Sequence, residues 1–555
     1  MGNTSCCQEE SQPVPKEVIE TQHACDDPKS SKSIQKPVEM AAIQVVTASQ
    51  ESQDTQVSKR CTHSGILNMP HFEVDADILR GIELEDSLRR LGKLWRESPL
   101  DLKIEDRTGL WEKSRPVQKY DVFLSHTWLT PGRWKVFSLL LQSGWKQMFA
   151  VWFFCISVVM TIGLLGWLPK PFLWRAGTLG FVTPTPFGPW MLATSFFSMI
   201  LGLSVVPYMP AWCRKSSVCF LDVACIHQTD KDLMARGVYG LGGFLRQSAE
   251  LRVLWSGPYL TRLWCVFELA AYHAANPAGK VTLSPIFVET GVLVMFLGAH
   301  AASLLVQIIM LTEVFGDSSL VVYFVGLLPT YIIIHLLRKI IRGKHNMIES
   351  LETFVLSDAQ CRNDFDREFI QNAICAWYGS EKAFEDFVRH DLREELLGMA
   401  STTSIPLPYI GMVAASVVSS TFDCITSLFI GKAPVETIVT HLIGYTFASS
   451  LFWFFALLTL VIYLCDRWAF PLCKDWDHLT TLVIFLVLVA SFYGGSIITT
   501  LACARSIWSA LAWCVCTALV AAVLILRKRL VESRRIARTL RKVDADLDGP
   551  DDRCP

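Results

Sequence analysis

The segment KYDVFLSH, residues 119–126, indicates the fold of the chain outside its long apolar runs. Its apolar centre is entered from polar residues and ends at Ser125 and His126. A fully apolar run of this length is typical of a central strand in a parallel sheet, where helices cover both faces. The sequence therefore predicts a strand whose last residues lie at the carboxyl edge of the sheet, where such sheets bind ligands.

Strands and helices are predicted to alternate on both sides of this segment. Further strands are predicted for SVCFLDVA (217–224), ELRVLWS (250–256) and KVTLSPIFV (280–288). Helices are predicted for IELEDSLRRLGKLW (82–95), GRWKVFSLLLQ (132–142), residues 233–250 and TRLWCVFELAAYH (261–273). This alternation indicates an α/β domain with a parallel sheet and helices on both of its faces.

The composition adds a second kind of structure. Apolar residues make up 51% of the 555 residues and charged residues only 19%, whereas a soluble chain carries about 25% charge. Runs of about 20 apolar residues predict membrane helices. We find eight, at 148–168, 187–206, 290–312, 319–337, 408–430, 442–464, 479–503 and 507–526. The prediction is an integral, multi-pass membrane protein with eight α-helical spans.

The charges next to these runs predict their orientation. Fourteen Lys and Arg residues flank the runs on the side shared with the N-terminus, and four lie on the other side. Because cytosolic flanks carry the excess of positive charge, both termini are expected in the cytosol. The sequence does not indicate which membrane the protein occupies.

The N-terminus, MGNTSCC, suggests attachment to membrane lipid. Gly2 is in the position for myristoylation, and Cys6 and Cys7 are suited to palmitoylation. The alternative is an unmodified N-terminus. Residues 1–65 are polar, hold no apolar signal peptide and are expected to be disordered, and 66–117 are expected to form a helical linker.

Several motifs in this order resemble the Toll/interleukin-receptor (TIR) domain, most closely its plant and bacterial form. They are YDVFLSH, CFLD, the pair Arg236–Gly237, and LRVLWSGPYLTRLWCVFEL, which contains WCxxEL as Trp264, Cys265, Glu268 and Leu269 after Tyr259. The chain departs from the family at Arg262, where a Ser is usual. The resemblance implies a flavodoxin-like parallel sheet over residues 118–143 and 215–289.

Membrane segments interrupt this domain, unlike the usual family plan. Hairpins at 144–214 and 290–337 would each leave and re-enter the cytosol, and a four-helix membrane bundle would follow at 408–526. Residues 338–407 would complete the domain, with a strand at 350–359 and a helix at 363–379. A basic helix and an acidic tail are expected over 527–555, with the helix against lipid headgroups.

The resemblance also implies an activity, because many TIR domains cleave the nicotinamide–ribose bond of NAD⁺. The family's catalytic residue corresponds to Glu268, with no metal and no cofactor and with NAD⁺ as the substrate. Substrate contacts would come from Ser125, His126, Arg236, Gly237, Trp264 and Cys265. Self-association through TIR domains is expected as well.

Two alternatives stay open at this stage. In the first alternative, Glu268 is an ordinary exposed helix carboxylate, and the domain is a non-catalytic signalling scaffold. The spans are alternatively a channel or transporter regulated by the domain, with Asp423, His300 and His335 as the ionisable groups inside them. The net charge of −1 argues against nucleic acid as a partner.

Overall fold

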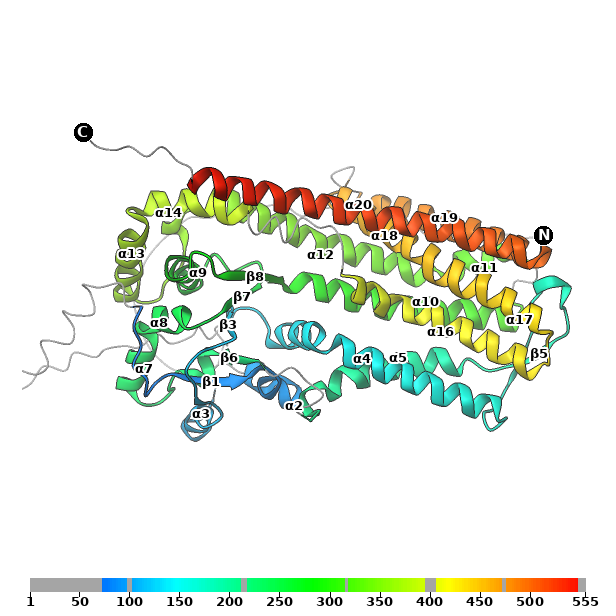
Figure 1. Ribbon diagram of the computed structural model, residues 1–555, viewed down its shortest axis with the longest axis horizontal. Coiled ribbons are helices and arrows are strands. Elements are labelled where there is room, and N and C mark those ends of the chain that lie inside the picture. Colours follow the sequence, from blue (N-terminus) through cyan, green and yellow to red (C-terminus); the bar gives the residue numbers. More distant parts are fainter. Residues whose placement is uncertain are drawn as a thin grey trace, which may run out of the picture. The chain divides into compact units, whose positions relative to one another are not determined.

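The computed structural model describes residues 72–96, 102–210, 217–314, 318–394, 406–471 and 476–547 (Figure 1). The three predicted acylation positions, Gly2, Cys6 and Cys7, lie outside these ranges.

A six-stranded sheet forms the centre of the α/β domain, in the order β2-β1-β6-β3-β7-β8. The strands are β1 Arg80–Glu83, β2 Arg115–Pro116, β3 Val122–Ser125, β6 Val218–Phe220, β7 Glu250–Trp255 and β8 Lys280–Pro285. The last four are parallel and confirm the strands predicted from the apolar runs. The short antiparallel strands β1 and β2 lie at one edge and were not predicted, because no apolar run marks them.

The parallel strands come from both sides of the first membrane hairpin. Strand β3 precedes the hairpin, yet its two neighbours, β6 and β7, both follow it. Val122 pairs with Cys219, and Phe123 pairs with Leu251. Because these strands share one sheet, the first hairpin must begin and end on the same side of the membrane.

Alternating residues of the strands face two helical layers, as the period of two in a strand requires. Phe123 packs in one core, with residues of α8 (Leu241–Arg246) and α9 (Leu263–Ala275). Its neighbours Val122 and Leu124 pack in the other core, with residues of α2 (Leu84–Arg96) and α4 (Gly132–Leu164). The domain is therefore a three-layer α/β/α arrangement.

Seven helices among the described residues are long and apolar enough to cross a membrane, and an eighth span requires counting a bent pair as one. The seven are α4, α5 (Trp190–Val205), α10 (Ile286–Thr312), α16 (Leu407–Ile430), the continuous α17 (Val435–His441), η6 (Leu442–Trp453) and α18 (Phe454–Arg467), α19 (Asp477–Arg505), and the part of α20 (Ile507–Leu547) up to Arg527. The bent pair is α11 (Ser319–Gly326) and α12 (Leu328–Glu352), at 45°. The expected eight spans are thus seven plus a broken one, and Pro329 in the first turn of α12 accounts for the break.

Several helices run without a break from the membrane segment into the α/β domain. The helix predicted at 132–142 is the beginning of α4, and α10 starts directly after β8, so the predicted strand at 280–288 ends earlier, at Pro285. Helix α12 continues to Glu352, where Met347 and Leu351 join the core around α9. Helices α4, α10 and α12 therefore belong both to the membrane segment and to the α/β domain.

The segment after the second hairpin packs into the same core, but the strand predicted at 350–359 is wrong. Residues 350–352 end α12, and Leu356–Asp358 form a short 3₁₀ helix. The apolar residues Met347, Leu351 and Phe354 follow helical spacing, which continues the stripe of α12 instead of starting a strand. The helix predicted at 363–379 is confirmed as α13 (Asp364–Tyr378), capped by Asn363, and α14 (Glu381–Phe387) follows.

The backbone of Gln360 joins this segment to the helix layer. Its N–H donates to the carbonyl of Thr261 (2.8 Å), and its carbonyl accepts from the N–H of Leu263 (3.1 Å). Leu263 is the first residue of α9. The chain that follows α12 therefore holds the start of α9.

Epitope tags inserted after Gly379 and after Gly177 are expected to lie on opposite sides of the membrane. Gly379 ends α13 in the α/β domain, and Gly177 lies in the connection between the far ends of α4 and α5. Both glycines have a positive φ, and no atom lies within 4 Å of the position that an added Cβ would take. An insertion after either should therefore be tolerated. Antibody binding to sealed vesicles before and after permeabilisation checks this; equal access to both tags in sealed vesicles would contradict the arrangement.

Candidate active site

The strand order reverses at β3, at the carboxyl edge of the sheet. From β3 the chain goes to β6 on one side and then to β7 on the other. In doubly wound sheets, ligands bind where the order reverses in this way. Ser125 ends β3, Tyr259 follows β7, and Glu268 lies on the next helix, α9, so the three residues meet at this point.

Glu268 is held by the Ser125 hydroxyl, which is in turn held by the Tyr259 hydroxyl. The Ser125 hydroxyl donates to Oε2 of Glu268 and also shares a hydrogen bond with the Tyr259 hydroxyl. Ser125 and Tyr259 are fully buried, whereas Glu268 keeps part of its surface open to solvent. The hydroxyls therefore orient a carboxyl group at the boundary between the core and solvent.

The surroundings of Glu268 favour its neutral form. Burial among protein atoms raises the pKa of Glu268 to about 8; the hydrogen bond from Ser125 opposes this, and the charge of Asp222 adds to it. Burial disfavours the charged form of a carboxyl group because a low dielectric stabilises charge poorly. Glu268 therefore ionises slightly above neutral pH, and such shifts are frequent at functional sites.

His126 follows Ser125 in the chain and is neutral. Its ring is buried between Trp95 and Trp128, at centroid distances of 5.1 and 4.9 Å. Burial lowers the pKa of His126 to about 4, and the nearby charge of Lys135 lowers it further, while Asp222 acts in the opposite direction. Nε2 of His126 is 3.9 Å from Oδ1 of Asp222. His126 is therefore suited to hydrogen bonding and not to carrying charge.

Sequence reasoning missed three residues of this cluster: Lys135, Asp222 and Tyr259. Nζ of the fully buried Lys135 donates to the carbonyl of Thr127 (3.0 Å) and lies 4.6 Å from the centre of the Trp128 ring. The Trp128 indole donates to Oδ2 of Asp222 at 2.8 Å. Asp222 and Tyr259 stand in the quoted motifs CFLD and SGPYL, so their signal was present without a role assigned to it.

The structure separates the two residues of the WC pair. Cys265 points to the cluster, its thiol donating to the carbonyl of His126 (3.5 Å), and burial raises its pKa well above the usual value, so the thiol is unreactive. Trp264 points to α13, where its indole is 3.4 Å from Oδ2 of Asp366 and its ring is near Phe369. Trp264 thus attaches α13 to α9 and faces away from Glu268 and Ser125.

Arg236 and Gly237 are not brought to Glu268 by any contact in the part of the chain that the structure describes. They lie on α7 (Lys231–Tyr239), where the Arg236 guanidinium pairs with Asp75 and Asp77 at 2.5–3.0 Å. Gly237 lies against Ile226, whose methyl group would be 3.1 Å from an added Cβ. Gly237 is buried inside the domain, and the exposed Arg236 fastens the segment before β1.

The ionisable residues of the membrane helices make structural contacts. Asp423 accepts hydrogen bonds from the backbone N–H groups of Met191 (2.8 Å) and Leu192 (3.1 Å), in the first turn of α5. A carboxylate in this position satisfies N–H groups that have no partner within the helix. His300 contacts Ser195 at 3.3 Å, and His335 contacts Thr481 at 3.0 Å. These contacts favour anchoring and packing over transport.

Comparison with known proteins adds no family to these observations. No protein-family model matches the chain, and neither a curated protein nor a solved structure matches it.

The contribution of Glu268 to the stability of the protein is expected to fall as the pH rises from about 4.5 to about 8. Between its usual pKa of 4.5 and its raised pKa of about 8, the folded state keeps a proton that the unfolded state releases. Glu268→Gln removes this contribution. Melting temperatures of both proteins across this range check it; a difference between them that does not change with pH would contradict it.

Proposed function

We propose that the chain is a membrane-anchored signalling protein whose TIR-like domain hydrolyses NAD⁺ at the nicotinamide–ribose bond, with Glu268 as the catalytic carboxylate. One observation carries the proposal. A partly exposed carboxyl group lies where the strand order reverses, oriented by Ser125 and Tyr259. The resemblance of the surrounding motifs to the TIR family supports the choice of NAD⁺ as the substrate.

The proposed reaction needs little more than a placed carboxylate. The bond between C1′ of the ribose and the nicotinamide nitrogen breaks, and its electron pair leaves with the now neutral nicotinamide. Positive charge then develops on the ribose, and a carboxylate stabilises it more in the transition state than in the ground state. Water adds to C1′ and loses a proton to Glu268 and then to solvent, which leaves ADP-ribose.

One neighbouring residue, Ser125, supports the ionised form of Glu268 when substrate is bound. The Ser125 hydroxyl donates to Oε2 and so favours the carboxylate. The positive nicotinamide ring would act in the same direction, against the burial that raises the pKa. Because the carboxylate is the active form, the rate at low substrate concentration should rise with pH up to about 8.

The second candidate is a non-catalytic scaffold that associates with other TIR domains. The same contacts favour it in one respect, because a carboxyl group with a raised pKa and a hydrogen bond to Ser125 is also suited to a purely structural role. Release of nicotinamide from NAD⁺ by the full chain, clustered after purification, separates the two functions.

A further inference from the structure

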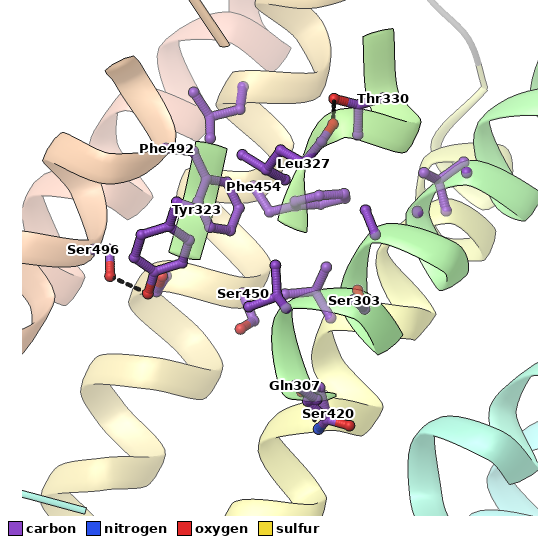
Figure 2. Close-up of a pocket in the computed structure, with 18 of the residues that line it drawn as sticks. Ser303, Gln307, Tyr323, Leu327, Thr330, Ser420, Ser450, Phe454, Phe492 and Ser496 are labelled. Atoms are coloured by element: carbon purple, nitrogen blue, oxygen red, sulfur yellow. Dashed lines mark hydrogen bonds between the residues drawn. The ribbon is translucent and has the colours of Figure 1, made fainter. Parts of the chain in front are cut away.

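A cavity of about 250 Å³ lies among the membrane helices, away from the cluster at the sheet edge (Figure 2). Residues of α10, α11, α12, α16, α18 and α19 line it, together with part of η6. Cavities that hold small ligands have volumes of roughly 300–1,000 Å³, so this one is close to the lower end of that range.

The lining defines the class of molecule that the cavity accepts. The lining is mostly apolar, with hydroxyl groups such as those of Ser303, Thr330 and Ser450. None of the described lining residues has a charged side chain. A charged ligand would be buried without a partner, which costs far more than burying a neutral one. The ligand is therefore neutral and mainly apolar.

One polar atom in the lining lacks a partner. Gln307 is 8% exposed, and its Nε2 donates to the Ser420 hydroxyl at 2.7 Å (Figure 2). Its carbonyl oxygen, Oε1, has no hydrogen bond among the described residues. A buried acceptor without a donor is destabilising, so this position favours a ligand that brings a hydroxyl group.

The position of Gln307 along α10 agrees with a lipid. Gln307 is about 32 Å along the helix from Ile286, where α10 leaves the α/β domain, at about 1.5 Å per residue. The hydrocarbon core of a bilayer is about 30 Å thick, so Gln307 lies near the membrane surface opposite the domain. The lining continues along α10 back to Met295, a distance of about 18 Å, so the ligand is elongated.

We propose that this cavity binds a neutral lipid with a hydroxyl headgroup, drawn from the leaflet opposite the α/β domain. Its hydroxyl donates to Oε1 of Gln307, and its apolar body extends between α10 and α12 toward Met295 and Leu337. Sterols and monoacylglycerols share this chemistry.

The test uses the purified full chain in lipid nanodiscs, with tritiated cholesterol and tritiated monoolein as separate probes. Saturable binding of at least one of them is expected, and the probe with the lower dissociation constant identifies the source. Gln307→Leu nearly keeps the volume but removes the acceptor, and it should weaken binding about tenfold. A matched control is Gln228→Leu, which changes a glutamine of the α/β domain and should leave binding unchanged.

A second variant and an analogue without the hydroxyl group test the proposal if Gln307→Leu does not fold. Ser303→Phe fills the cavity and should abolish binding of both probes. An analogue of the bound probe that lacks the hydroxyl should bind the parent about tenfold more weakly than the probe does. The proposal is overturned if neither probe binds saturably, if Ser303→Phe leaves binding unchanged, or if the analogue binds the parent as tightly as the probe.

Discussion

Replacing Glu268 with glutamine is expected to lower nicotinamide release from NAD⁺ by about 100- to 1,000-fold, the usual cost of removing one preorganised electrostatic group from an active site. Glutamine keeps the shape of the side chain but removes the negative charge that stabilises the ribose in the transition state. The measurement is nicotinamide release by the full chain, solubilised and clustered, with parent and variant at equal concentration.

Two supporting variants and one control sharpen this test. Ser125→Ala and Tyr259→Phe remove the hydroxyls that orient Glu268, so each should reduce the rate by about tenfold. Glu349→Gln makes the same chemical change at an exposed position of α12 and should have no effect. Full activity of Glu268→Gln would remove Glu268 from the mechanism. If the clustered parent does not consume NAD⁺, the scaffold function replaces the enzyme.

Replacing Asp477 with alanine is expected to destabilise the protein by about 3–5 kcal/mol, because it leaves a buried cation unpaired. The Arg338 side chain on α12 has no exposed surface, and its Nη1 lies 2.8 Å from Oδ1 of Asp477. Arg342 reaches the same oxygen at 2.7 Å. Arg338 also donates to the carbonyl of Trp468 at 2.8 Å. This network ties α12 to the connection between α18 and α19.

The melting temperature in detergent measures the effect, with Arg467→Ala as a control on an exposed side chain of the same region. The control should change stability by less than about 0.5 kcal/mol. The double variant Arg338→Met with Asp477→Leu removes both charges and should recover most of the loss. A melting temperature of Asp477→Ala equal to that of the parent would show that the pair contributes nothing.

Helix α12 carries Arg338 and Arg342 between the membrane cavity and the core of the α/β domain. Its first half lines the membrane cavity through Thr330 and Leu337, and its second half joins the core around α9 through Met347 and Leu351. The backbone of Gln360 then holds the start of α9, the helix that carries Glu268. One helix and one backbone bridge therefore connect the cavity to the proposed catalytic carboxyl group.

Elements with a local signal could be predicted from the amino-acid sequence. The apolar runs predicted the membrane helices, and the short apolar segments predicted the four parallel strands, because burial on all sides leaves an unbroken apolar run in the sequence. The same local signal wrongly predicted a strand at 350–359, where the apolar residues continue the apolar stripe of α12 into the core of the α/β domain.

Only the tertiary structure decided which segments meet. Strand β3 pairs with strands from beyond a membrane hairpin, and Ser125 reaches Glu268 across that insertion. Trp264 and Cys265 are adjacent in sequence but face α13 and His126, and Arg236 pairs with Asp75 instead of joining the site. A period in the sequence shows which face of an element is buried, but the partner on that face comes from a distant segment, so packing alone selects it.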